Sequence, residues 1–206
     1  MRPRGVPDGA WPGPLLRPVA PWWRMARDGY LVPMERLLFE GVVHTDYRQF
    51  DLTWGEDAFA EGGDASYAGQ ENGLVGAADP TGLQLVLGRR SGGSSVRIEL
   101  WAEEPPADAR WEDVVEVSFV LPEHREMLWE SWGGEQYGSL DGVPAGDLRL
   151  RVSAFGRDAG ADNEFAEEVV DFYLLQMWPA PAQPDAIVRV GSADAEYWHR
   201  EAGGNR

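Results

Sequence analysis

The stretch Gly146–Ala180 constrains the fold more than any other part of the sequence. Within Asp147–Ala154, apolar residues alternate with polar ones, which is the period of a β-strand with one buried and one solvated face. Within Asp171–Trp178, apolar residues occupy both faces, which is typical of a strand covered on two sides. Pro179 ends this second strand. Two strands joined by the acidic segment Arg157–Val169 therefore predict a β-rich fold.

Short strand patterns of the same kind recur along the rest of the chain, separated by turns rich in Gly, Pro, Asp and Ser. Val96–Leu100 and Val115–Leu121 alternate clearly, and Asp79-Pro80-Thr81-Gly82 is a hairpin signal between two further strands. No amphipathic helix of any length is indicated. The pattern predicts a mostly β fold, an antiparallel β-sandwich of about eight to nine strands, with a barrel as the alternative.

Proline and charge divide the chain into three parts. Residues 1–36 are rich in Pro and Arg, and they predict an irregular N-terminal arm that is disordered or loosely docked. Residues 37–192 are expected to form the β-sandwich domain, and residues 193–206 a polar C-terminal tail. Inside the domain, Gly55–Asn72 is expected to be a long loop with one helical turn near Asp57–Glu61.

The composition excludes several kinds of chemistry. The chain has no Cys and no Lys, so disulfides, thiolate metal sites and Schiff-base lysines are absent. No apolar run approaches the roughly 18 residues that a membrane-spanning helix needs. Prolines interrupt the N-terminal apolar residues, which argues against a signal peptide. We therefore expect a soluble, cytoplasmic protein.

The charge is strongly negative and unevenly distributed. The formal net charge is −17; residues 1–36 carry six Arg against Asp8, Asp28 and Glu35, a net +3, so the remaining residues carry −20. Such a field repels nucleic acid and anionic membranes and attracts basic proteins or divalent cations.

No catalytic constellation and no cofactor motif is indicated. The chain has three His and no Gly-x-Ser-x-Gly motif, so we predict no catalytic residue and no enzyme activity. Taking Asp158 as the first position of an EF-hand places Asn163 where Gly is required and Val169 where Glu is required, so we assign no metal ligand. A carbohydrate- or calcium-binding sandwich is the alternative, and it requires a concave face with at least two exposed Trp for sugars. A hydrolase that uses paired carboxylates is the third hypothesis.

Several short motifs between Asp46 and Trp178 follow one another in a recognisable order. They are Tyr47-Arg48-Gln49-Phe50 in a first strand, Trp54 with a following acidic loop, the middle strand Glu116–Leu121, the strand entry within Leu140–Leu150, and a closing strand Asp171–Leu175. This order resembles the competence protein J family of small nuclease inhibitors. The chain is also similar to uncharacterised actinobacterial proteins that share Gly156-Arg157-Asp158-Ala159-Gly160 and the segment Tyr173–Ala180. Residues 1–40 and 186–206 lie outside the resemblance.

The resemblance implies a protein that binds, and can inhibit, a basic partner such as a nuclease. Carboxylates would steer the partner and aromatic side chains would anchor it. We expect no nucleic-acid or membrane partner, and the oligomeric state is left open. The two acidic loops are expected to share one end or face of the domain. The expected contact residues are Glu56, Asp57, Glu61 and Asp64 in the first loop, Asp158, Asp162, Glu164, Glu167 and Glu168 in the second, and Trp129, Trp132 and Tyr137 as anchors.

Overall fold

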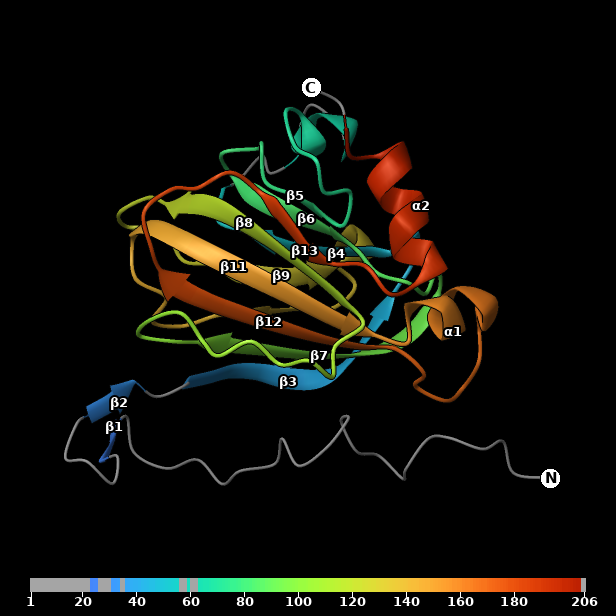
Figure 1. The fold of residues 1–206 in the computed structure, drawn as a ribbon, viewed down its shortest axis with the longest axis horizontal. Coiled ribbons are helices and arrows are strands. Elements are labelled where there is room, and N and C mark those ends of the chain that lie inside the picture. Colours follow the sequence, from blue (N-terminus) through green and yellow to red (C-terminus); the bar gives the residue numbers. More distant parts are fainter. Residues whose placement is uncertain (1–22, 26–30, 34–35, 56–58, 60–62, 205–206) are drawn as a thin grey trace.

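The protein consists mainly of two β-sheets (Figure 1). A computed structural model describes residues 23–25, 31–33, 36–55, 59 and 63–204. The six-stranded sheet has the order β13 (Ala186–Arg189), β8 (Asp113–Leu121), β11 (Gly146–Phe155), β12 (Phe172–Pro179), β7 (Gly92–Leu100) and β3 (Arg36–Thr45). The five-stranded sheet has the order β10 (Tyr137–Ser139), β9 (Leu128–Ser131), β4 (Gln49–Thr53), β6 (Gly82–Val86) and β5 (Val75–Gly76). The prediction of a mostly β fold is confirmed, and the two sheets hold more strands than the eight or nine expected.

Short elements complete the described chain. β1 (Trp23–Met25) and β2 (Leu31–Pro33) pair with each other inside the segment that the sequence predicted to be irregular. A 3-10 helix, η1, spans Gly63–Tyr67, whereas most of the helical turn expected near Asp57–Glu61 lies outside the described residues. A second 3-10 turn, η2, spans Trp132–Gly134. No helix in the described part of the chain is long and apolar enough to span a membrane.

One pair of strands departs from the antiparallel prediction. β12 runs parallel to β7, with Tyr173 beside Val96, whereas the other strand pairs found in the described residues are antiparallel. The long connection through β8 and β11 allows the chain to return in the same direction, which a short hairpin cannot do.

Both sheets contribute to one apolar core. Phe50 and Leu85 from the five-stranded sheet and Ile98, Leu150 and Leu175 from the six-stranded sheet belong to a single cluster of buried residues. Ile98 and Leu150 belong to the apolar halves of alternating patterns, so in these two strands the two-residue period correctly predicted which side chains face the core.

The other face of the six-stranded sheet is not solvated as the sequence predicted. Arg149, Arg151 and Ser153 of β11 are buried, because the segments 101–111 and 180–185 cover this face. Their charge is matched by carboxylates: Glu116 accepts hydrogen bonds from Arg149 Nε at 3.3 Å and from Arg151 Nε at 2.7 Å, and Glu104 lies 2.8 Å from Arg151 Nη2. The alternation therefore correctly predicted which face is polar, but the prediction that this face is solvated was wrong.

A helix follows the last strand where the sequence predicted only a polar tail. α2 (Ala193–Glu201) begins at Ser192, whose Oγ accepts a hydrogen bond from Ala195 N at 3.1 Å and donates to Asp113 at 2.6 Å. Ala195 is completely buried in the core. The N-cap Ser, with Asp194 and Glu196 in the first turn, was the signal that the sequence analysis missed.

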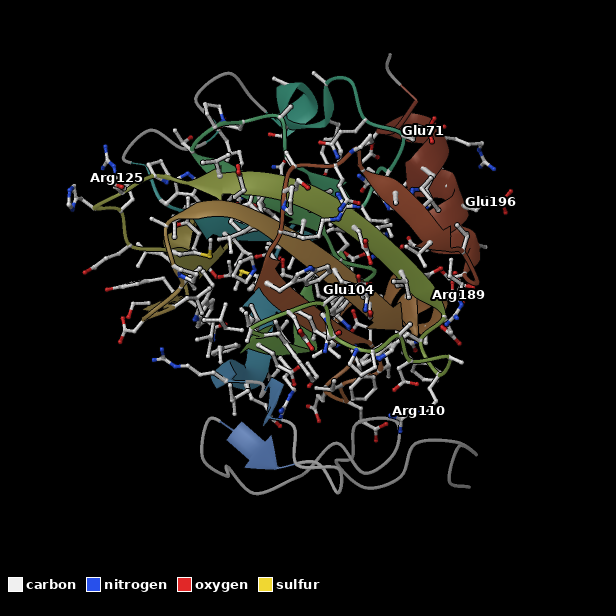
Figure 2. The ribbon with its side chains drawn as sticks, turned by 60° about the vertical axis from the view of Figure 1, so that its left-hand side comes forward. Glu71, Glu104, Arg110, Arg125, Arg189 and Glu196 are labelled. Carbon is white, nitrogen blue, oxygen red and sulfur yellow. The ribbon has the colours of Figure 1, made fainter. Side chains whose placement is uncertain are left out.

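The strand register gives the molecule two ends. Gln49 of β4 lies opposite Val86, near the turn to β7, while Thr53 lies opposite Gly82 and Leu128 at the other end. We call the first the α1 end; it comprises the turns 46–48, 89–91 and 132–136 and the loop 156–170, which contains α1 (Arg157–Asp162). Arg125 lies in the turn between β8 and β9 at the opposite end, and Figure 2 shows it on the other side of the molecule from Glu196 of α2.

Candidate protein-docking surface

The turn between β3 and β4 adopts a backbone conformation that its residues disfavour. Gln49 N donates to Asp46 O at 3.1 Å, and the central residues Tyr47 and Arg48 have φ values of 54° and 68°. Turns of this kind favour Asn-Gly, and each left-handed non-glycine residue costs about 1–2 kcal/mol. Strain of this kind persists only where surrounding contacts fix it, and it is concentrated at functional sites.

Arg48 supplies those contacts on the inner side of the turn. Its Nη1 donates to the carbonyl oxygen of Gly88 and lies 3.2 Å from Asp194 Oδ1 of α2. The guanidinium also lies 5.8 Å from the ring centroid of Trp198. Tyr47 consequently points outward, with 63% of its surface exposed.

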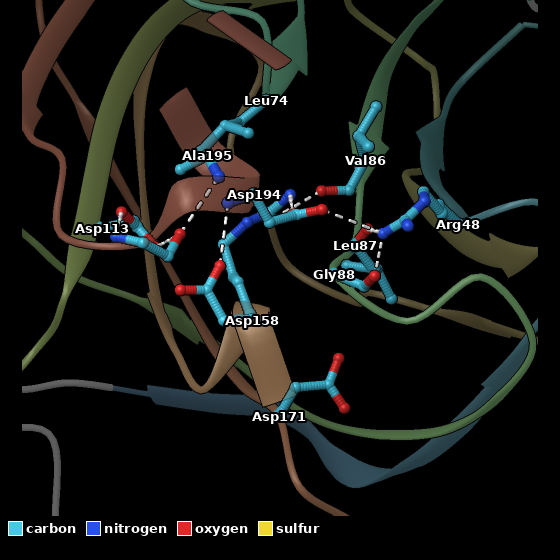
Figure 3. Close-up of polar contacts among 12 residues, drawn as sticks. Arg48, Leu74, Val86, Leu87, Gly88, Asp113, Asp158, Asp171, Asp194 and Ala195 are labelled. Carbon is cyan, nitrogen blue, oxygen red and sulfur yellow. Dashed lines mark hydrogen bonds and ion pairs between the residues drawn. The ribbon is translucent and has the colours of Figure 1, made fainter. Parts of the chain in front are cut away.

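Asp194 holds α1 as well as the Tyr47-Arg48 turn. Its Oδ2 lies 2.7 Å from Nη2 of the buried Arg157, the first residue of α1. In return, Asp158 accepts a hydrogen bond from the backbone nitrogen of Asp194 at 2.8 Å (Figure 3). Figure 1 shows α1 and α2 next to each other. One carboxylate on α2 therefore positions both the turn and the beginning of the acidic loop.

The close approach of α1 to the strand ends depends on a glycine. A Cβ atom at Gly88 would lie 2.6 Å from the carbonyl oxygen of Arg157, too close for any other residue without a backbone shift. Arg157 Nη1 donates to the carbonyl oxygen of Val86 at 2.7 Å and fixes the same approach.

Exposed aromatic side chains gather at this end. The ring of Tyr47 lies 5.2 Å from that of Trp132, which is 39% exposed. Tyr137 is exposed on β10 opposite Glu130, and Phe165 is exposed in the acidic loop with a φ of 78°. We call these four residues the aromatic patch. Large exposed aromatics are characteristic of protein-binding surfaces.

Backbone hydrogen bonds connect the turns that carry the aromatic patch. Arg48 N donates to Arg90 O at 3.0 Å, and Phe165 N donates to Ser91 O at 3.1 Å. The turn 132–136 is held by Gln136, whose Oε1 accepts from His44 N at 2.8 Å. The aromatic patch thus lies on connected backbone segments.

Exposed acidic side chains lie on the same turns and loop as the aromatic patch. Glu135 lies in the turn after Trp132, and Asp162, Glu167 and Glu168 are exposed in the loop that carries Phe165. Arg90 is the one exposed arginine in the described turns of the α1 end. Its Nε lies 3.7 Å from Glu164 Oε1, and its Cζ lies 5.7 Å from the ring centroid of Tyr47.

The structure brings part of the predicted site together. Seven of the expected contact residues lie at the α1 end: Trp132, Tyr137, Asp158, Asp162, Glu164, Glu167 and Glu168. Asp158 accepts hydrogen bonds from backbone nitrogens at the start of α2, and Glu164 forms an ion pair with Arg90. The other five residues are exposed.

Trp129 does not belong to this surface. It is 8% exposed, and its ring packs 4.4 Å from that of Phe39 and 6.0 Å from that of Phe50. The expectation that it anchors a partner is therefore wrong, because it occupies the core-facing parity of β9.

The first acidic loop leaves the sheets from the opposite end. Glu56, Asp57 and Glu61 lie outside the described residues, and the backbone of Asp64 forms part of η1. Phe59 N donates to Asp79 Oδ2 at 3.2 Å, which places the beginning of this loop at the end farther from α1. The described residues therefore do not join the two acidic loops into one surface.

Three further residues of the surface were not found from the sequence. Tyr47 was expected inside a strand, whereas it forms the turn, and Arg90 and Phe165 were not singled out. No local motif marks them, because they meet only through contacts between segments distant in the sequence.

The requirements of the alternative functions are not met by the described residues. Among the tryptophans between residues 36 and 204, Trp132 alone is exposed, so the two exposed Trp needed for a sugar platform are not found in this part of the chain. In the described part of the chain, no group of three or more His, Cys, Asp or Glu is arranged to hold a metal ion. A cavity of about 150 Å³ lies between η1 and β8, lined by residues that include Ala77, Ser118 and Asp185, and it contains no paired carboxylates.

Asp51 and Glu130 are two neighbouring carboxylates in the five-stranded sheet. They are cross-strand neighbours on β4 and β9. Burial raises the pKa of Asp51 to about 7, against a hydrogen bond from Gln49 that lowers it, and the charge of Glu130 raises it further. Asp51 is only 2% exposed, so no substrate can reach it in this conformation.

Comparison with known proteins gives two distant structural neighbours. No family model and no curated protein matches the chain. The crystal structure of ComJ, inhibitor of the DNA degrading activity of NucA, from Bacillus subtilis is 18% identical, with a TM-score of 0.46 over 71% of this chain and 99% of ComJ. A structure described as crocagin biosynthetic gene J is 15% identical, with a TM-score of 0.44 over 72% of this chain and 99% of its own. With TM-scores below 0.5, neither similarity bears on function.

Proposed function

We propose that this chain is a non-enzymatic module that binds a basic protein at its α1 end. The observation that carries the proposal is the ring pair of Tyr47 and Trp132, in which Tyr47 is exposed on a turn whose left-handed backbone is held by Arg48. An exposed Tyr47 in a strained turn does not stabilise the fold, whereas a rigidly held aromatic side chain can anchor a binding partner.

The charge around the aromatic patch supports a basic partner. Carboxylates at the rim of an interface accelerate association with a positive surface and disfavour negative ones. The affinity then comes from aromatic side chains that become desolvated in the complex. The resemblance of the sequence to nuclease inhibitors suggests a nuclease as the partner, and we propose inhibition of its DNA-degrading activity as the outcome of binding.

The first experiment compares partner capture by the full chain and by patch variants. Tyr47→Ala combined with Trp132→Ala is expected to weaken binding of the captured basic protein by about 100-fold or more, since two hot-spot aromatics are lost. Isothermal titration with the purified partner measures the change. Tyr197→Ala removes an exposed aromatic on α2 outside the patch and should leave the affinity unchanged.

The charge contribution is tested separately. Glu164→Gln with Glu168→Gln should slow association and reduce its salt dependence, whereas the matched pair Glu123→Gln with Glu126→Gln at the opposite end should not. A nuclease assay of the captured protein, with and without the chain, tests inhibition.

Equal binding of the captured partner by wild type and by the Tyr47→Ala, Trp132→Ala double variant would contradict the proposed docking surface.

A further inference from the structure

Arg90 differs from the other arginines near the α1 end. Arg48, Arg89 and Arg157 are engaged with backbone carbonyls or buried carboxylates, whereas 58% of the Arg90 side chain is exposed. Its guanidinium lies against the Tyr47 ring at 5.7 Å and against Glu164 at 3.7 Å. An aromatic face with an adjacent carboxylate is the arrangement by which proteins bind a foreign cation.

We propose that Tyr47 and Glu164 form a receptor for an arginine side chain of the basic partner, and that Arg90 is its internal occupant, displaced on binding. This inference rests on the proposed function and names the chemistry that the same surface recognises. The occupant is a protein segment rich in arginine, because a planar guanidinium stacks on a phenol ring better than a lysine ammonium does.

The contacts of Arg90 are suited to displacement. Both are exposed, and exposed ion pairs and cation–π contacts contribute little net stability. The turn does not need the side chain, since Arg90 holds Arg48 N through its backbone oxygen. Arg90→Ala therefore leaves the turn intact and vacates the receptor.

Titration with hexa-arginine amide tests the inference. Arg90→Ala is expected to bind the peptide about fivefold more tightly than wild type, because an internal competitor and a like charge are removed. Arg125→Ala removes the same charge at the opposite end and should change the affinity by less than about twofold, as expected for a distant exposed charge. Tyr47→Ala should weaken binding, and hexa-lysine should bind wild type less tightly than hexa-arginine.

The outcomes separate this inference from the proposed function. If Arg90→Ala binds hexa-arginine no better than Arg125→Ala does, Arg90 does not occupy a cation receptor and the inference fails. Capture of the basic partner that still depends on Tyr47 and Trp132 would then leave the docking surface itself standing. As a second readout, the guanidinium NMR signal of Arg90 should move toward that of a free arginine when the peptide is added; an unchanged signal at saturation would also refute displacement.

Discussion

Replacing Asp51 by Asn is expected to stabilise the protein at pH 8 by up to about 4 kcal/mol. The pKa of Asp51 is raised by burial from 3.8 to about 7 in the folded protein, so the folded state binds the proton more tightly than the unfolded chain. Its contribution to stability is therefore present below pH 4 and is lost as the pH rises to 7. Asn stays neutral and can still accept the hydrogen bond from Gln49.

Chemical denaturation at pH 4, 6 and 8 measures this difference. The free energies of unfolding of wild type and Asp51→Asn should nearly coincide at pH 4 and diverge up to pH 7. Asp147→Asn removes an exposed carboxylate and serves as the control. Curves of wild type and Asp51→Asn that stay parallel from pH 4 to 8 would show that Asp51 does not titrate in this range.

Glu116→Gln is expected to destabilise the protein by about 3–5 kcal/mol, because it leaves two buried guanidiniums without their shared counter-charge. Glu116 contacts Arg149 and Arg151, and its side chain is 15% exposed. Arg151 also pairs with Glu104, whose side chain is 67% exposed. Glu104→Gln should therefore cost less than about 1 kcal/mol, as is usual for an exposed ion pair.

The two variants form a matched pair, since each removes one carboxylate from Arg151. Urea denaturation at pH 7 measures both free energies of unfolding. Similar small losses would mean that water reaches Arg149 and Arg151, and the covering segments 101–111 and 180–185 would then not seal this face. A large loss for Glu104→Gln alone would reverse the assignment of which carboxylate neutralises Arg151.

The strands could be predicted because a two-residue period is a local property. The strand expected at Val115–Leu121 is β8, and the one expected at Asp171–Trp178 is β12, each shifted by two residues or fewer. The exposure of the polar face could not be predicted from alternation, because Arg149 and Arg151 are covered by segments distant in the sequence. The parallel pairing of β12 with β7 could not be predicted either, because the two strands are distant in the sequence.

Two exposed aromatic residues of the candidate site could be found from the sequence, because they lie close together in it. Trp132 and Tyr137 flank the Gly133-Gly134 turn, and both are exposed. Tyr47 and Arg90 could not be found in this way, because the contact between them joins two turns that are distant in the sequence and that each connect one sheet with the other. The burial of Trp129 could not be predicted from alternation, because the apolar residues Met127 and Leu128 occupy both faces of the same strand pattern.

The position of Asp194 in the chain also determines when the Tyr47-Arg48 turn and α1 can take up their final positions. Arg48 and Arg157 both depend on this one carboxylate, and it follows every strand in chain order. Domains generally fold as units, and Ala195 of α2 belongs to the same core as the strands, so the sheets and α2 are expected to complete their packing together. The strained turn that presents Tyr47 therefore gains its last support only when α2 has packed on the sheets.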